Sequence, residues 1–217
     1  MTAEQGPNLR IVKPQPPRPV HDVTAGVPDR LSSRQAARHL SDEVVAALAR
    51  GGEEAAWEAA YRTYQRGLRG YLMVQLRDKD DAEEAFSETF LRAQDRIGTL
   101  RTHTADSFRS WLYRIARNVA IGRQRVRRRL VCMADPAHDE PDLLLGGFDD
   151  SVVQSEDFAA VRRAFASLDP DDQEVLWLRV VLELSSDSVA GIVGKRPGAI
   201  RMQQRRALVQ LGRRLGL

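Results

Sequence analysis

Hydrophobic residues recur every three or four positions over most of this chain, the spacing that places them on one face of an α-helix. Residues 57–72 and 82–97 both show this spacing. The longest unbroken run lies in residues 108–120, at Phe108, Trp111, Leu112, Ile115, Ala116, Val119 and Ala120. No segment shows a clear alternation of hydrophobic and polar residues, so no strand is predicted. The pattern predicts a first domain, residues 40–129, that is a bundle of helices.

A second helical domain is predicted at residues 157–217. Asp169 and Pro170 form a strong helix start, because aspartate caps a helix and proline suits the first helical position. Three helices follow, at about residues 170–182, 186–193 and 197–214. The predicted fold class is therefore all-α, with two small helical domains.

Two segments lack the helical periodicity. Residues 1–39 hold six of the ten prolines, and we expect them to form a disordered arm. From residue 131 to residue 160 the sequence has eight acidic residues, two Pro and two Gly, but no Lys or Arg. We therefore assign residues 130–156 as a flexible acidic linker between the two domains.

A helix-turn-helix pattern lies near the carboxyl terminus. Ala190 is small enough for two helices to cross closely, and Gly194 suits a turn that needs a positive φ. Ile200, six residues later, is placed to pack the second helix onto the first. This spacing of Ala, Gly and Ile is typical of a helix-turn-helix that binds duplex DNA.

The second helix of this motif has two contrasting faces when it is projected at about 100° per residue. One face is predicted to pack inward and holds Ile200, Gln204, Ala207, Leu208 and Leu211, with Gln204 bonded to a neighbouring backbone group. The opposite face holds Arg201, Met202, Arg205 and Arg206, and Arg196 precedes the helix. Long cationic side chains can reach both guanine edges and phosphates, so we predict a recognition helix.

The first domain ends in a second basic surface. The periodic helix from Phe108 runs into a cluster of arginines between residues 123 and 129. Its predicted outer face combines cations for phosphates with groups that bond or stack on bases, namely Ser110, Tyr113, Arg114, Arg117, Asn118, Gln124 and Arg125. His103 lies in the loop before this helix. Phe108 and Trp111 belong to the hydrophobic stripe, so we expect them in the core.

Composition excludes several classes of protein. The net charge is only +3, so the charge segregation described above matters more than the sum. The single cysteine, Cys132, excludes an internal disulfide framework and zinc-finger spacing, and it suits a reducing cytoplasm. No run of about 18 apolar residues is present to span a membrane. The histidines show no metal-ligand spacing, so neither a catalytic residue nor a cofactor is predicted.

Three segments resemble the extracytoplasmic-function (ECF) subfamily of the sigma-70 family of RNA polymerase sigma factors. DDAEEAFSETFLRAQ (residues 80–94) and FRSWLYRIARNVA (residues 108–120) resemble the second conserved region of that family. SLDPDDQEVLWLR (residues 167–179) resembles the start of its fourth region, which the helix-turn-helix completes. Ser87 and Gln94 replace the Gln and Trp that are usual in the first segment. The resemblance covers residues 41–129 and 157–217.

The resemblance implies that the chain is a non-enzymatic subunit that gives RNA polymerase its promoter specificity. Residues 40–129 would be sigma region 2, which grips the clamp helices of the largest polymerase subunit through Asp81, Glu84 and Glu88. The same region would capture the melted −10 element with the loop at residues 101–107 and the following helix, through His103, Arg114, Arg117, Asn118 and Arg125.

Residues 157–217 would be sigma region 4, which contacts the polymerase flap and reads the −35 element through Arg196, Arg201, Met202, Arg205 and Arg206.

Many relatives are held by an anti-sigma factor. The expected location is the cytoplasm, at the nucleoid within holoenzyme, without membrane contact. In relatives the linker threads the polymerase cleft. The acidic linker of this chain would either mimic nucleic acid in that cleft or serve only as a flexible tether between the two domains, and both interpretations remain open.

Two other functions compete with this interpretation. A one-component or response-type transcription regulator would share the helix-turn-helix but would bind specific duplex DNA without polymerase. A nuclease or recombinase would need clustered carboxylates for metal ions. The candidate carboxylates are spread along one helix face, at Asp80, Asp81, Glu83, Glu84 and Glu88.

Overall fold

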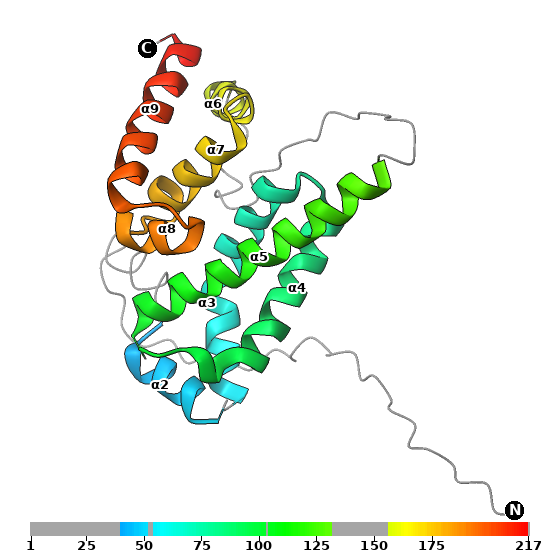
Figure 1. Ribbon diagram of the computed structural model, residues 1–217, viewed down its shortest axis with the longest axis vertical. Helices are drawn as coiled ribbons and strands as arrows, with labels where there is room; N and C mark the ends of the chain where they lie inside the picture. Colours follow the sequence, from blue (N-terminus) through cyan, green and yellow to red (C-terminus); the bar gives the residue numbers. More distant parts are fainter. Residues whose placement is uncertain (1–39, 52–53, 103, 132–155, 217) are drawn as a thin grey trace, which may run out of the picture.

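A computed structural model describes residues 40–51, 54–102, 104–131 and 156–216 of the chain (Figure 1). Within these ranges every regular element is a helix and no strand occurs, which confirms the predicted all-α class. No helix in this part of the chain is long and apolar enough to cross a membrane. The arm at residues 1–39, His103 and nearly all of the linker lie outside the described residues.

Between residues 40 and 131, the described part of the first half contains four helices and one short 3₁₀ turn. They are α2 (Asp42–Gly51), α3 (Glu54–Leu76), α4 (Lys79–Arg96), η1 (Ile97–Thr99) and α5 (Ala105–Val131). Asp78 caps α4, because its carboxylate accepts a hydrogen bond from the Asp81 backbone N–H at 2.9 Å. The predicted stripe of α5 is buried, and the rings of Phe108 and Trp111 contact each other at a tilt of 41°, with their centroids 5.7 Å apart.

The second half contains four helices and a π-helical turn. They are α6 (Glu156–Ala166), α7 (Pro170–Leu176), η2 (Trp177–Val181), α8 (Ser186–Val193) and α9 (Pro197–Leu215). Asp169 caps α7 through the Asp171 N–H at 2.9 Å, with Pro170 at the first helical position as predicted. The predicted helix at residues 170–182 is α7 followed by η2.

The helix-turn-helix consists of α8 and α9. Gly194 ends α8 with a φ of 74°, in the left-handed region that glycine adopts without strain. Ala190 is 6% exposed and Ile200 is fully buried where the two helices cross. Ser185 caps α8 by accepting a hydrogen bond from the Ser188 N–H at 3.0 Å. The three residues that carried the sequence pattern therefore hold the roles predicted for them.

The two halves pack against each other. Their buried hydrophobic side chains form one continuous cluster, in which α7 lies on α3 and α8 lies on α5 (Figure 1). Gly67 permits this approach, because a Cβ atom there would lie 2.7 Å from the Tyr113 hydroxyl and 3.1 Å from Leu182 Cδ2. The sequence pattern of each half alone gives no sign of this contact.

Candidate nucleic-acid and polymerase interfaces

The outer face of α9 is basic, and most of its arginine side chains form no ion pair within the described residues. Arg201, Met202 and Arg205 are exposed, and Arg196 occupies the residue before the first turn. Among the described residues, Arg196, Arg201 and Arg205 make no ion pair, so their guanidinium groups are available to an anionic ligand. Arg201 and Arg205 are four residues apart, which places them about 6 Å apart along the helix axis. That face is suited to the edge of a DNA groove.

Arg206 differs from the other arginines of α9. Its guanidinium lies 3.4 Å from Asp172, whose side chain is only 4% exposed. Asp172 also accepts a hydrogen bond from Gln203 Nε2 at 2.9 Å, and Lys195 donates to Gln203 Oε1 at 3.0 Å. A buried carboxylate needs such donors because desolvation of an unpaired charge is costly. Arg206 therefore stabilises the buried Asp172 carboxylate, in addition to any contact that it makes with DNA.

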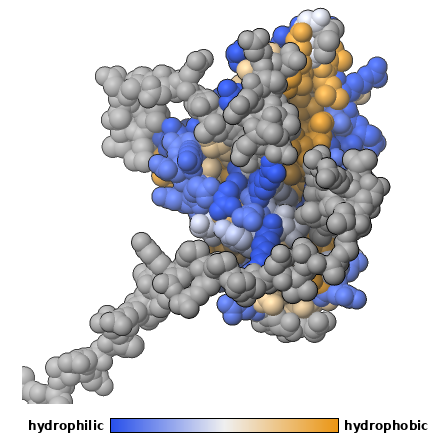
Figure 2. All heavy atoms as spheres, turned by 180° about the vertical axis from the view of Figure 1, so that it is seen from behind, coloured by the Kyte–Doolittle hydropathy of each residue, from blue (hydrophilic) through white to orange (hydrophobic). Residues whose placement is uncertain are grey.

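The predicted inner face of α9 needs two corrections. Leu208 was expected to pack inward but is 43% exposed, because α6 and α7 cover α9 from the side of Gln203 and Ala207. Gln204 was expected to bond a backbone group, but its Oε1 accepts a hydrogen bond from Arg179 Nε at 2.9 Å. Figure 2 shows hydrophobic side chains gathered in a band on one side of the molecule. On α9, Val209 is exposed beside Leu208.

The basic face of α5 is only partly open. Arg114, Asn118 and Arg125 are exposed and, among the described residues, make no ion pair. Arg117 is different, because its side chain is 25% exposed and its Nε lies 3.0 Å from Glu174 of α7. Tyr113 was predicted on the outer face, but it is 1% exposed. It packs edge-on against Tyr71 at 5.5 Å, beneath the second half of the molecule.

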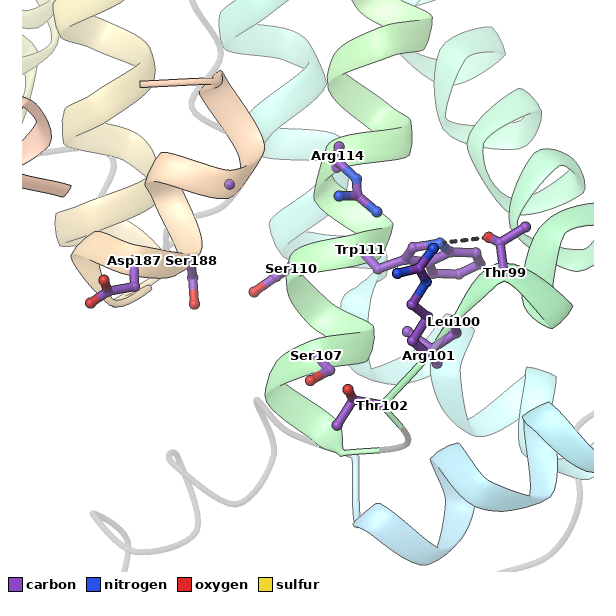
Figure 3. A pocket seen from close by; sticks show the side chains of 11 residues that line it. Thr99, Leu100, Arg101, Thr102, Ser107, Ser110, Trp111, Arg114, Asp187 and Ser188 are labelled. Atoms are coloured by element: carbon purple, nitrogen blue, oxygen red, sulfur yellow. Dashed lines mark hydrogen bonds between the residues drawn. The ribbon is translucent and has the colours of Figure 1, made fainter. Parts of the chain in front are cut away.

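A cleft of about 590 Å³ lies beside this face, between the loop after α4, the start of α5 and the start of α8 (Figure 3). Hydroxyl and guanidinium groups line it, from Thr99, Arg101, Thr102, Ser107, Ser110 and Arg114, with Asp187 and Ser188 of α8 on the opposite side. Trp111 forms part of its wall and donates from Nε1 to Thr99 Oγ1 at 3.3 Å. Such a lining offers donors to phosphates and bases.

The predicted polymerase-binding carboxylates share one arginine of the basic cluster, a pairing that the sequence did not predict. Arg123 of α5 lies 2.8 Å from Glu84, 3.1 Å from Glu88 and 3.7 Å from Asp81. Arg92 binds the other oxygen of Glu88 at 2.6 Å. Burial alone would lower the pKa of Arg123, but its hydrogen bonds to Glu84 and Glu88 raise that pKa above its ordinary value.

Metal binding is not supported at this surface. Glu84 remains 70% exposed, so the surface still presents negative charge to a partner. Within the described residues, no group of three or more His, Cys, Asp or Glu side chains could hold a metal ion. The carboxylates face arginines instead.

A buried polar contact joins the two halves. Glu174, whose side chain is 7% exposed, accepts hydrogen bonds from the Tyr71 hydroxyl at 2.6 Å and from Arg117 Nε at 3.0 Å. Burial and the neighbouring Glu174 carboxylate raise the pKa of Tyr71 well above its usual value, so the phenol stays a donor. No sequence signal pointed to Glu174, because its partners lie 103 and 57 residues away.

Comparison with known proteins agrees with this arrangement. Two family models match, "Sigma-70 region 2" over residues 60–130 and "Sigma-70, region 4" over residues 158–211. The ECF RNA polymerase sigma factor BldN of Streptomyces coelicolor is 36% identical over 168 residues, which are 77% of this chain and 63% of BldN. RNA polymerase sigma factor YlaC of Bacillus subtilis is 27% identical over 71% of this chain and 88% of its own.

A solved structure shares the fold. The sigma factor RpoE of Bartonella quintana, in complex with the anti-sigma factor NepR, matches with a TM-score of 0.63 and 22% identity, over 74% of this chain and 96% of its own. Both conserved sigma regions are thus matched, in order along the chain, and the similar proteins include factors named as ECF sigma factors. The chain belongs to the sigma-70 family of RNA polymerase sigma factors.

Proposed function

We propose that this protein binds core RNA polymerase and directs it to promoters, melting the −10 element and initiating transcription. Residues 40–129 serve as sigma region 2 and residues 157–217 as sigma region 4, joined by the acidic linker at residues 130–156. The protein itself catalyses no reaction. The observation that carries the proposal is the presence, in one chain, of a basic face on α5 and a second basic face on α9 of the helix-turn-helix.

Region 2 takes the −10 element as a single strand. The cleft beside Trp111 has a volume of about 590 Å³ and a polar lining that includes Arg114, which suits an unpaired base, and Asn118 is exposed on the same helix. Extracting a base costs a few kcal/mol of stacking, which hydrogen bonds and stacking in the cleft offset. His103, Arg117 and Arg125 complete the predicted −10 surface.

Region 4 reads the −35 element as a duplex, with α9 in the major groove. Arg201 and Arg205 point to base edges, whereas Arg196 and Arg206 contact the phosphate backbone and Met202 packs against bases. The observation that supports this assignment is that all five side chains, on α9 and at the residue just before it, are exposed.

Core polymerase is held at two surfaces. The carboxylates of Asp81, Glu84 and Glu88 face the basic clamp helices of the largest subunit, and charge complementarity orients the encounter. The exposed apolar pair Leu208 and Val209 on α9 suits a hydrophobic contact with the polymerase flap. We further propose that an anti-sigma factor restrains the protein, as NepR binds its Bartonella quintana relative. The site of action is the cytoplasm, at the nucleoid within holoenzyme.

Run-off transcription tests the proposal. Core polymerase, the purified protein and fragmented genomic DNA are combined, and the 5′ ends of the transcripts are sequenced. We expect a set of start sites that share −10 and −35 motifs and that vanish when the protein is omitted. Start sites identical with and without the protein would refute the proposal.

Two companion assays separate the competing functions. A transcription regulator would shift specific duplex DNA without polymerase, whereas the sigma factor is expected to do so weakly or not at all. A nuclease would cleave DNA when a divalent metal ion is added to the purified protein.

A further inference from the structure

A buried carboxylate lies between α7 and the recognition helix α9. Asp172, in the first turn of α7, has a side chain that is only 4% exposed, and α7 packs against α9 (Figure 1). Its Oδ1 accepts hydrogen bonds from Gln203 Nε2 at 2.9 Å and from Arg206 Nη2 at 3.4 Å. Gln203 and Arg206 are three residues apart, so they project from the same side of α9. One acidic residue of α7 therefore holds two successive points of the helix that is proposed to enter the major groove.

The stability of the fold does not by itself account for this carboxylate. Burial of a charged group costs free energy, and apolar side chains of similar volume often stabilise an interior position at least as well as an ion pair does. Other buried positions of α7 and α9 are indeed apolar, among them Val175, Ile200 and Ala207. The Arg206 side chain, by contrast, is 66% exposed. The pair therefore joins a buried anion to a cation at the surface, an arrangement that suits orientation of the cation.

The Arg206 guanidinium is held on one side and open on the other. Asp172 engages Nη2, whereas within the described residues Nε and Nη1 of Arg206 make no hydrogen bond. A guanidinium is planar and carries its N–H donors in a fixed fork, so a bond to one amino group sets the directions of the remaining donors. Met202, one turn earlier on α9, is 72% exposed, so this side of the helix faces solvent. The remaining donors are thus available to an anion outside the protein.

We propose that Asp172 is a positioning residue for the −35 contact, which presents the free edge of the Arg206 guanidinium to a backbone phosphate without touching DNA itself. This inference rests on the proposed function, in which Arg206 contacts the phosphate backbone, and deepens it by assigning the group that orients that contact. Arginine binds phosphate most strongly through two parallel N–H donors. A guanidinium that is already oriented loses less conformational freedom when it reaches the phosphate.

The same network extends to the turn of the helix-turn-helix. Gln203 Oε1 accepts a hydrogen bond from Lys195 Nζ at 3.0 Å, and Lys195 also pairs with Asp171 of α7 at 2.9 Å. Lys195 immediately precedes Arg196, the other residue that is proposed to contact phosphate. Asp172 and Gln203 therefore connect the first turn of α7 both to the middle of α9 and to the turn that carries Arg196.

Two explanations of Asp172 predict effects of opposite sign. If Asp172 acts on DNA only through its charge, Asp172→Asn removes a negative charge near the phosphates and strengthens promoter binding. If Asp172 positions Arg206, the same substitution weakens binding, because a neutral amide oxygen holds a guanidinium less strongly than a carboxylate does. Asparagine keeps the size of the side chain and an oxygen that accepts from Gln203, so the substitution disturbs the packing little.

Heteronuclear NMR of the full-length protein measures the hold on Arg206 directly. A guanidinium bound to a carboxylate rotates slowly about its Cζ–Nη bonds, and Arg206→Ala identifies the Arg206 signals. We expect restricted rotation in the parent and in Asp171→Asn, and faster rotation in Asp172→Asn. Asp171→Asn is the matched control, because it removes the same charge one residue earlier, from a carboxylate that is 64% exposed and pairs with Lys195.

Free rotation of Arg206 in the parent, or unchanged rotation in Asp172→Asn, would overturn the proposal. Circular dichroism checks that Asp172→Asn keeps its helices, and the measurement on the parent decides the proposal where that variant does not fold.

Holoenzyme binding to a promoter tests whether this orientation matters for DNA. The probe is the strongest promoter obtained by run-off transcription, as a fluorescein-labelled duplex. We expect Asp172→Asn to weaken binding about fivefold, whereas Asp171→Asn should not weaken it. In an Arg206→Ala background, Asp172→Asn should cause no further loss. Tighter binding by Asp172→Asn, or equal weakening with and without Arg206, would overturn the proposal.

Failure of this inference is distinct from failure of the proposed function. The NMR comparison uses neither polymerase nor DNA, so it decides whether Asp172 orients Arg206 in either case. The absence of any promoter that depends on the protein would count against the proposed function instead.

Discussion

Replacing Arg201 or Arg205 with alanine is expected to change which −35 sequences the holoenzyme accepts. Neither side chain makes an ion pair among the described residues, so its removal leaves no buried charge uncompensated in the protein. The change in promoter preference then reports the lost DNA contact rather than a damaged fold. Arg206 lacks this advantage, because it is also a partner of the buried Asp172.

The magnitude follows from the geometry of α9. Four residues of helix advance about 6 Å, close to the rise of two base pairs, so Arg201 and Arg205 address neighbouring but different positions. A bidentate arginine–guanine contact contributes about 1–3 kcal/mol of discrimination, which is a 5- to 150-fold preference. Each variant should lose a preference of that size at one or two −35 positions and keep its −10 preference.

The assay is holoenzyme transcription from a promoter library randomised at the −35 element, with transcripts counted by sequencing. Arg213→Ala is the control, because Arg213 is exposed in the last turn of the same helix. The −35 sequence preference of Arg213→Ala should match that of the parent protein. An unchanged −35 profile in both Arg201→Ala and Arg205→Ala would remove these two residues from base recognition and would direct attention to Arg196 and Met202.

Four further outcomes are expected. Glu84→Gln should weaken binding to core polymerase at least about fivefold in a pull-down titration, while Asp95→Asn should not. Arg206→Ala should weaken all promoters alike and lower the salt dependence by about one unit. Deletion of residues 1–39 should leave run-off start sites unchanged. Gly122→Ala should raise the free energy of unfolding in urea by about 0.5–1 kcal/mol, since that helical glycine has open space around it; a lower stability would contradict this.

Hydrophobic periodicity predicted the helices and most of their inner faces because it reports what a single helix buries. The stripe of residues 108–120 is the core side of α5, and the Ala190, Gly194 and Ile200 spacing marks the crossing of α8 and α9. Both patterns are local. Each depends on residues within about two or three turns of one another.

The errors arose where distant segments meet. Tyr113 was predicted on the outer face of α5, and that side of the helix is covered by elements far along the chain. Gln203 rather than Gln204 is the buried glutamine, because its partner Asp172 lies 31 residues earlier. The pairing of Arg123 with the acidic surface, and the role of Glu174, were not predicted for the same reason. Their importance depends on carboxylates and donors that only the tertiary fold brings within reach.

The arginine shared by the acidic surface distinguishes two carboxylates that look equivalent in the sequence. Glu88 uses one oxygen for Arg123 and the other for Arg92, so both of its oxygens already accept strong donors. Glu84 uses only Oε2 for Arg123, and within the described residues its Oε1 accepts no hydrogen bond. A carboxylate oxygen has two lone pairs, so Glu84 can bind an incoming cation without releasing Arg123. A polymerase arginine would thus join the existing pair at Glu84, whereas at Glu88 it would have to share oxygens that are already engaged.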